Sequence, residues 1–181
     1  IYRNRAKIND DIYVSGNLGD SYLGLMVLKK KIKLNNLFNK YFVTQYFKPS
    51  IQLKLADQLK KFANSSIDIS DGLLTDLEKL INNQKLSYKL NLNNIPISQN
   101  LKKEIEFKKL KKINIISNGD DYQVLFTAPR NKRRIINKIS TKLSVKITKI
   151  GQIQNKSFKS SVIDQNNAVI SFKNKGYLHK F

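Results

Sequence analysis

The chain has 181 residues, of which 40% are hydrophobic, so it is long enough to bury a core as one domain or a compact pair of domains. It contains no cysteine and a single histidine, His179, which excludes disulfides, thiolate catalysis and a histidine-rich metal site. The net charge of +21 comes mostly from lysines spread along the chain, so we interpret it as a compositional bias and not as a nucleic-acid-binding surface.

The first third of the chain is predicted to hold one strand and three helices. Residues 11–15 form a short β-type run, and the two glycines of residues 16–19 indicate a turn. Asp20 or Ser21 then caps a helix that continues to about residue 34. Two further helices are predicted over residues 37–47 and 51–62.

The middle of the chain alternates between strand and helix patterns. Residues 66–70 are predicted to form a short strand that carries Asp68, and a helix with an apolar face follows over residues 73–81. Apolar and polar side chains alternate over residues 87–93, which is typical of a half-buried strand. A short helix is predicted from Ser98 to about residue 106.

The last third begins with a polar turn over residues 117–120 and a strand over residues 121–127. An amphipathic helix follows Pro129 and ends near residue 143, and residues 145–153 and 168–172 are predicted to be closing strands. Because βα units are mixed with strand pairs, we expect an α/β (α+β) fold, an α/β/α layered domain with a mixed sheet.

Residues 67–73, Ile-Asp-Ile-Ser-Asp-Gly-Leu, join a predicted strand to a predicted helix. In an extended segment Asp68 and Ser70 point to the same face, and Asp71 begins the helix, where free backbone N–H groups favour anions. Carboxylate oxygens beside an anion site suit Mg²⁺ that protein and phosphate hold together. The alternative is that Ser70 or Asp71 serves only as an N-cap.

Two other glycine-containing segments are candidates for ligand contact. Residues 117–127 place paired acids, Asp120 and Asp121, after a glycine turn, where one acid is within reach of a cationic ligand; the alternative is an Asx-type turn that leads into a strand. Residues 16–21 precede a helix and are a candidate phosphate loop, but they lack the Lys-Ser/Thr ending of a P-loop. We favour an ordinary strand-to-helix connection for the latter.

The three segments occur together, and with residues 175–179, Lys-Gly-Tyr-Leu-His, they closely resemble thiamine-monophosphate kinase. This family belongs to the superfamily of aminoimidazole ribonucleotide synthetase. The resemblance spans all 181 residues but only the C-terminal portion of the family, and because residue 1 is Ile and not Met, we expect the missing part to lie upstream. Residues 1–181 are then the C-terminal domain, and the N-terminal domain is absent from the chain.

The resemblance implies a superfamily fold in which two α/β domains bind ATP in the cleft between them and dimers form through the N-terminal domain. The implied reaction is the ATP- and Mg²⁺-dependent phosphorylation of thiamine monophosphate to thiamine diphosphate, the last step of thiamine diphosphate biosynthesis, with several Mg²⁺ ions. The acceptor phosphate is already anionic, so we expect direct in-line transfer without a catalytic base or a covalent intermediate. The isolated chain is expected to be inactive because further metal-binding aspartates lie in the N-terminal domain, and the full-length enzyme is expected to be a homodimer.

The resemblance also implies roles for particular residues. Asp120 stands where the family usually has glutamate, so its reach to the substrate is one methylene shorter, and Asn118 replaces a usual glycine and is expected to tolerate left-handed geometry. The implied metal ligands are Asp68 and Asp71, the implied ATP contacts are Arg3 and Ser70, and the implied substrate contacts are Asp120 and Tyr177.

Two alternative classes of function remain open at this point. One is another ATP-dependent enzyme of the same superfamily, similar to selenophosphate synthetase or to a hydrogenase-maturation protein. The other is a basic nucleic-acid-binding module, which predicts strongly salt-dependent binding and no need for Asp68 or Asp71. No apolar run approaches the ~20 residues of a membrane span, so we expect a soluble, cytoplasmic chain without a membrane or nucleic-acid partner.

Overall fold

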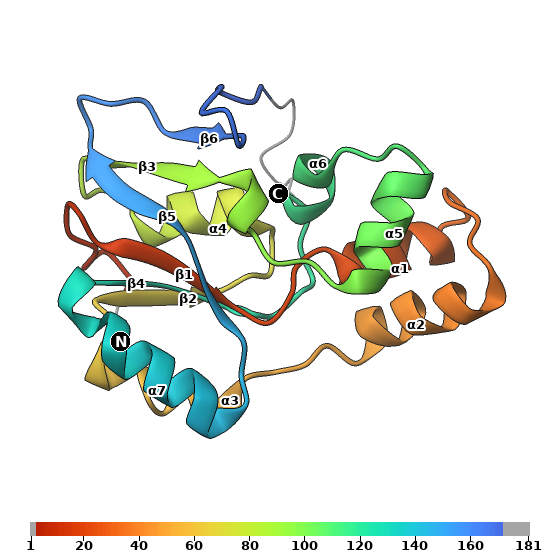
Figure 1. Cartoon of the computed structure of the whole chain (residues 1–181), viewed down its shortest axis with the longest axis horizontal. Helices are drawn as coiled ribbons and strands as arrows, with labels where there is room; N and C mark the ends of the chain where they lie inside the picture. Colours follow the sequence, from red (N-terminus) through yellow and green to blue (C-terminus); the bar gives the residue numbers. More distant parts are fainter. Residues whose placement is uncertain (1–2, 172–181) are drawn as a thin grey trace.

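The computed structural model describes residues 3–171 as one mixed six-stranded sheet with helices on both faces and a helical group beyond one end (Figure 1). The strands lie in the order β2-β4-β1-β5-β3-β6, and all neighbours are antiparallel except β3 and β6. This confirms the predicted mixed sheet. The strands are β1 Asp11–Ser15, β2 Ser65–Asp68, β3 Leu86–Asn91, β4 Val124–Ala128, β5 Ile147–Asn155 and β6 Ser161–Ile163.

Helix α4 covers one face of the sheet, α3 and α7 cover the other, and α1, α2, α5 and α6 gather at the end of the sheet (Figure 1). The α/β/α layering is therefore confirmed. None of the helices between residues 3 and 171 is long and apolar enough to cross a membrane. The α-helices are α1 Asp20–Leu28, α2 Asn36–Phe47, α3 Leu53–Ala56, α4 Leu73–Leu80, α5 Gln99–Phe107, α6 Lys112–Ile116 and α7 Arg133–Leu143. Single 3₁₀ turns are η1 Leu59–Lys61, η2 Leu92–Asn94 and η3 Arg130–Lys132.

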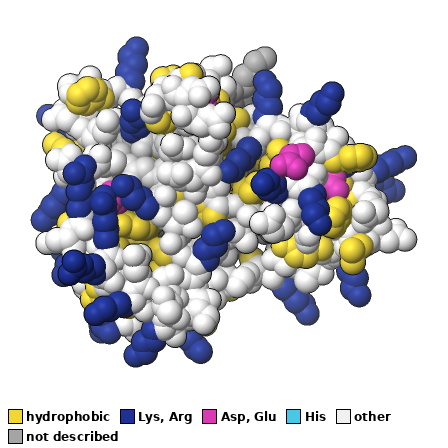
Figure 2. Space-filling view, viewed as in Figure 1, with side chains coloured by type: hydrophobic (Ala, Val, Ile, Leu, Met, Phe, Trp, Pro, Cys, Tyr) yellow, Lys and Arg dark blue, Asp and Glu magenta, His cyan; other side chains and the backbone are white. Residues whose placement is uncertain are grey.

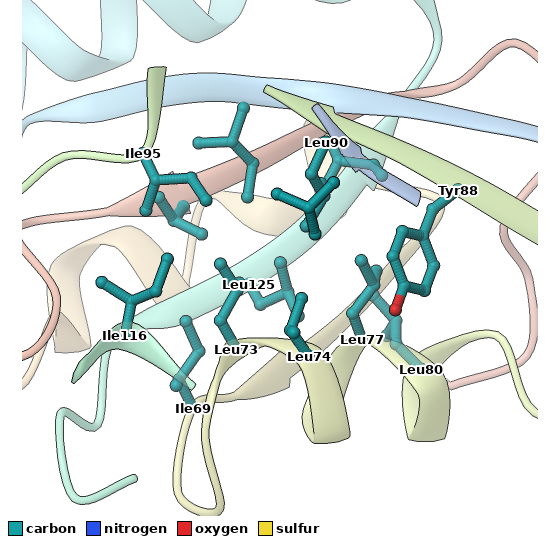
Figure 3. Close-up of a cluster of buried hydrophobic side chains, with 14 of the residues drawn as sticks. Ile69, Leu73, Leu74, Leu77, Leu80, Tyr88, Leu90, Ile95, Ile116 and Leu125 are labelled. Atoms are coloured by element: carbon teal, nitrogen blue, oxygen red, sulfur yellow. The ribbon is translucent and has the colours of Figure 1, made fainter. Parts of the chain in front are cut away.

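Alternation along the central strand β1 divides the core between the two faces. Ile12 and Val14 pack on the α4 side, whereas Tyr13 packs on the α7 side and stacks on Phe126 with 5.1 Å between ring centroids. This is the period of two that an extended strand imposes on its side chains. On the α4 side, the four leucines of α4 point toward the strands (Figure 3). Burying each leucine contributes about 1.5–3 kcal/mol, so α4 is fixed firmly against the sheet.

The first predicted helix is too long, because α1 ends at Leu28 and not near residue 34. Lys30 adopts a left-handed φ of 55°, and the chain reverses so that α2 packs on α1. The helices approach closely at Gly24, where an added Cβ atom would lie 2.2 Å from the carbonyl oxygen of Phe42. Tertiary packing thus ends the helix where the local pattern permits it to continue.

Two further predictions differ from the structure, and two elements of the structure were not predicted. The helix predicted over residues 51–62 is divided into α3 and η1, and α6 lies in a segment for which no element was predicted. The strand predicted over residues 168–172 is reduced to one bridge between Ile163 and Val169, and residue 172 lies outside the described residues. Strand β6 at the sheet edge was not predicted, because its three residues are too few to show the alternation of apolar and polar side chains that indicates a strand.

Candidate functional site

A cavity of about 600 Å³ lies between helix α1 and two loops, residues 69–72 and 117–122. The first loop connects β2 to α4, and the second connects α6 to β4. The two segments that the sequence singled out therefore form two walls of one cavity. Its lining residues are Tyr22, Leu25, Met26, Lys29, Lys31, Ser70, Asp71, Asn118, Gly119, Asp120 and Tyr122.

Backbone hydrogen bonds join the two loops. The N–H of Asp120 donates to the carbonyl oxygen of Ser70 at 3.0 Å, and the N–H of Tyr122 donates to that of Ile69 at 2.9 Å. The N–H of Ile69 donates in turn to the carbonyl oxygen of Gln123 at 2.9 Å. These bonds extend the antiparallel pairing of β2 with β4 beyond the strands, so the sheet itself places the loops side by side.

Two glycines permit this close approach, one from each loop. An added Cβ atom on Gly72 would lie 2.0 Å from the carbonyl oxygen of Ser117, and one on Gly119 would lie 1.8 Å from that of Ser70. Gly72 also has a φ of 114°, which L side chains rarely adopt. Each glycine thus faces the backbone of the opposite loop, and the requirement for glycine comes from packing of one loop on the other.

The buried carboxylate of Asp76 organises the first loop. Its Oδ2 atom accepts hydrogen bonds from the N–H groups of Ser70 at 2.9 Å, Asp71 at 2.8 Å and Gly72 at 3.1 Å, and its side chain is 0% exposed. The expectation that Asp71 begins the helix and that free N–H groups attract an anion is therefore wrong in part. Helix α4 begins at Leu73, and a carboxylate of its own chain already occupies these three donors.

Lys79 carries a positive charge to the same place. Its Nζ atom contacts Asp71 Oδ2 and also lies 3.2 Å from Asp76 Oδ1. Burial acts to lower the pKa of Lys79, but the hydrogen bonds with Asp71 and Asp76 outweigh it and leave the pKa raised. Asp71 thus lines the cavity and forms an ion pair with Lys79.

Three acids surround the phenol of Tyr122. Burial raises the pKa of Tyr122, and the charges of Asp120, Asp68 and Asp71 raise it further. Burial and the charge of Asp71 raise the pKa of Asp120, while Lys29 on the opposite wall lowers it. The cavity therefore has an acidic side, and its basic side comes from α1 and the residues that follow it.

Two residues of the second loop have a strained backbone conformation. Asp120 has a φ of 69° and Tyr122 a φ of 49°, both left-handed values that non-glycine residues rarely adopt. Asn118 was expected to tolerate left-handed geometry, but it does not need to, because the positive φ values of this loop fall on these two later residues. Such strain persists only where the surroundings impose it, here through the backbone pairing with the first loop.

The structure brings together three of the six predicted site residues. Ser70, Asp71 and Asp120 line the cavity, whereas Asp68 is exposed at the end of β2 and acts on Tyr122 through its charge. Arg3 is exposed near the other end of α4, where the N–H of the next residue bonds to the carbonyl oxygen of Leu80. Eight helical residues span about 12 Å, so this chain does not place Arg3 beside Ser70. Tyr177 and the motif of residues 175–179 lie outside the described residues.

The segment of residues 16–21 is a structural connection, as favoured above, but neither of its predicted caps is correct. The carboxylate of Asp20 accepts hydrogen bonds from Ser98 Oγ at 2.7 Å and Tyr41 Oη at 2.9 Å. The N–H of Gly19 donates to the buried Asp121 at 2.8 Å, so a residue of the second loop holds the start of α1. Burial raises the pKa of Asp121 to about 8.

The position of Asp76 in the sequence indicates its structural role, although neither the composition nor the motif spacing does so. Asp76 lies three residues after Leu73 and four before Leu80, and it therefore falls on the apolar face of α4. A carboxylate on the buried face of a short helix requires hydrogen-bond partners, and the nearest donors are the N–H groups at the helix start. No comparable signal marks Lys79, Lys29 or Lys31 in a chain so rich in lysine.

The chain is similar to known proteins over nearly all of its length. No protein-family model matches the chain. Curated thiamine-monophosphate kinases do match it: that of Buchnera aphidicola subsp. Schizaphis graminum is 36% identical over 181 residues, which are 99% of the chain and 55% of the relative. The chain is homologous to the C-terminal portion of thiamine-monophosphate kinase. It spans about half the length of the curated relatives it matches.

Solved structures agree with this homology. A thiamine-monophosphate kinase from Stenotrophomonas maltophilia K279a superposes on 93% of the chain with a TM-score of 0.79 and 26% identity, and the match covers 54% of that structure. A second thiamine-monophosphate kinase, AaThiL complexed with AMPPCP and TMP, covers 97% of the chain with a TM-score of 0.76 and 26% identity, over 53% of its own length. Hydrogenase maturation protein HypE has the same fold, with a TM-score of 0.64 at 13% identity.

Proposed function

We propose that this chain is the C-terminal domain of a thiamine-monophosphate kinase, which transfers the γ-phosphoryl group of ATP to thiamine monophosphate. The observation that carries the proposal is the cavity in which Ser70, Asp71 and Asp120 meet from two separate motifs. The homologous AaThiL is described in complex with the ATP analogue AMPPCP and with TMP, which supports ATP and thiamine monophosphate as the two substrates.

The charges around the cavity suit a transfer between two phosphates. Both reactants are anionic, and two unit charges about 4 Å apart repel by roughly 4 kcal/mol at an intermediate dielectric. Lys29 and Lys31 line one side of the cavity and attract the phosphates, while Asp71 and Asp120 on the other side require cations. We assign no catalytic base, because the acceptor oxygen is already anionic, and we propose direct in-line transfer without a covalent intermediate.

The donor set fits magnesium in part. Asp71 and Asp68 offer carboxylate oxygens, the ligands that Mg²⁺ prefers, and Lys79 shows that a cation is tolerated against Asp71. Across residues 3–171, no group of three acidic or histidine side chains is placed to hold a metal ion. We therefore propose that Asp68 and Asp71 act together with phosphate oxygens and with ligands from outside these residues. Bound magnesium would offset the negative charge of the phosphates.

The incomplete site motivates a second domain. We propose that the part of the relatives not matched by this chain corresponds to an N-terminal domain that supplies further metal ligands, and that the complete enzyme is a homodimer. Arg3, which lies away from the cavity, and Tyr177 remain proposed contacts of ATP and of the substrate in that complete enzyme. Robust thiamine-monophosphate kinase activity from the 181 residues alone would contradict the need for the second domain.

The proposed nucleotide site is tested by titrating the ¹⁵N-labelled chain with AMPPCP in the presence of Mg²⁺. We expect weak binding, with the largest amide shifts at Ser70, Asp71, Gly119 and Asp120, since these residues line the cavity. Asp71→Asn is expected to weaken binding at least tenfold, because a metal ligand loses its charge. The control is Asp57→Asn, which removes an exposed charge elsewhere. Shifts confined to surface lysines, or equal losses in both variants, would rule out this site.

Removing the charge of Lys79 is expected to strengthen metal binding, in contrast to removing the charge of Asp71. Because its ammonium group pairs with Asp71, a divalent cation must displace it or share the carboxylate. Lys79→Met removes the competing charge and is expected to raise the affinity of the chain for Mg²⁺ several-fold in calorimetric titration. Lys61→Met, which removes an exposed lysine bonded to the side chain of Gln58, is the control and should leave the affinity unchanged. A fall in affinity on removing Lys79 would show that it assists the metal site.

A further inference from the structure

Asp76 has contacts that go beyond those of an ordinary helix residue. One of its oxygens accepts the N–H groups of three consecutive residues, at 2.9, 2.8 and 3.1 Å, and its other oxygen lies 3.2 Å from Lys79 Nζ. We propose that Asp76 is a positioning residue for the nucleotide–metal site, which sets the conformation of the Ser70–Asp71–Gly72 loop without touching the ligand. This inference rests on the proposed function of that loop.

The three bonds to Asp76 are strong ones. Hydrogen bonds to a charged acceptor are shorter than neutral ones and roughly twice as strong. The Asp76 side chain is fully buried, so water does not compete for the same oxygen. Burial raises the pKa of Asp76, while the N–H of Asp71 and the charge of Lys79 oppose that rise. The loop therefore has one strong internal anchor.

Asp76 also fixes the side chains of Ser70 and Asp71. The N–H groups bonded to Asp76 belong to Ser70 and Asp71 themselves, so their backbone orientation and hence the direction of their side chains depend on it. Ser70 also accepts the N–H of Asp120 through its carbonyl oxygen. A change at Asp76 is therefore transmitted to a residue of each cavity wall, although Asp76 is not among the residues that line the cavity.

A second buried aspartate allows a positioning role of Asp76 to be distinguished from a contribution to general stability. Asp10 is a matched case, because it is also a buried aspartate, 2% exposed, that accepts a loop N–H, that of Lys7 at 3.0 Å. It additionally accepts from Asn64 Nδ2 at 2.8 Å. Its contacts lie at the start of β1, and it does not line the cavity. Asp76→Asn and Asp10→Asn thus make the same chemical change with similar burial, at one site that supports the loop and one that does not.

The experiment compares these two variants of the whole chain with the unaltered chain. Three quantities are measured: the midpoint of urea unfolding, hydrogen exchange of the amides of Ser70, Asp71 and Gly72, and the dissociation constant of Mg²⁺ with AMPPCP from amide shifts. We expect both variants to lose stability. Only Asp76→Asn should accelerate exchange at the three loop amides and weaken nucleotide binding by about 10–100-fold, as removal of a group that orients metal ligands does.

The outcomes distinguish this inference from the proposed function. Unchanged exchange at the loop amides in Asp76→Asn, or equal loss of affinity in both variants, would overturn the positioning role. Failure of the unaltered chain to bind nucleotide would instead contradict the proposed function of the cavity. The exchange measurement needs no ligand, so it tests the hold of Asp76 on the loop in either case.

Discussion

Replacing Gly119 with alanine is expected to lower the free energy of unfolding by about 3 kcal/mol and to open the cavity wall, because overpacking against backbone is at the costly end of its range. The new Cβ atom would lie 1.8 Å from the carbonyl oxygen of Ser70 and 2.6 Å from its carbonyl carbon. Both atoms belong to the backbone, so no side-chain rotation relieves the clash. The loops must separate, and the hydrogen bond from Asp120 to Ser70 is lost with them.

The measurement is urea unfolding together with amide shifts of the two loops. Asn118→Ala is the matched control, since it changes the neighbouring residue in the same loop, where a Cβ atom is already present. Its known contact is a bond from Nδ2 to the carbonyl oxygen of Asn114, so it should cost about 1 kcal/mol or less. Gly72→Ala should behave like Gly119→Ala, with added strain from its φ of 114°. A Gly119→Ala variant as stable as Asn118→Ala would show that the loops are not packed as described.

The sequence predicted the layers of the fold well where local pattern and tertiary packing agree. Strand β1 and helix α2 follow their apolar patterns almost residue for residue, and α5 begins directly after Ser98, where a helix was predicted to start. The pattern was insufficient where one element is shaped by another. Helix α1 ends at Leu28 because α2 packs back on it, and α6 was missed because its five residues are too few to show a helical period.

The candidate site, like the fold, could be predicted only in part. The meeting of Ser70, Asp71 and Asp120 could be predicted because a family resemblance supplied the pairing of two distant segments. The backbone hydrogen bonds that hold the two loops together could not be predicted, because they join atoms whose proximity depends on the register of β2 with β4. The contact of Arg3 with ATP was inferred from the resemblance alone and stays a prediction, since in this chain Arg3 lies near the end of α4 away from the cavity.

The pH dependence of stability should report on Asp121. Burial raises its pKa from 3.8 to about 8, and the nearby charges of Asp20 and Asp120 act in the same direction, although the N–H of Gly19 opposes the rise. A raised folded-state pKa means that the folded chain holds a proton that the unfolded chain has released. Its contribution to stability is therefore fully present below about pH 4 and is lost as the pH rises toward 8.

Asp121→Asn isolates this contribution, because an asparagine keeps an oxygen that accepts the N–H of Gly19 but does not ionise. The stability of the unaltered chain relative to the variant should fall by up to about 1.4 kcal/mol per pH unit between pH 4 and 8. Lys112, whose pKa burial lowers to about 8, titrates at the upper limit of this range, but it is common to both chains and does not contribute to the difference. Urea unfolding at four pH values gives the two profiles. Parallel profiles would mean that Asp121 is ionised in the folded chain, and the start of α1 would then be bound to a buried charge and not to a neutral acid.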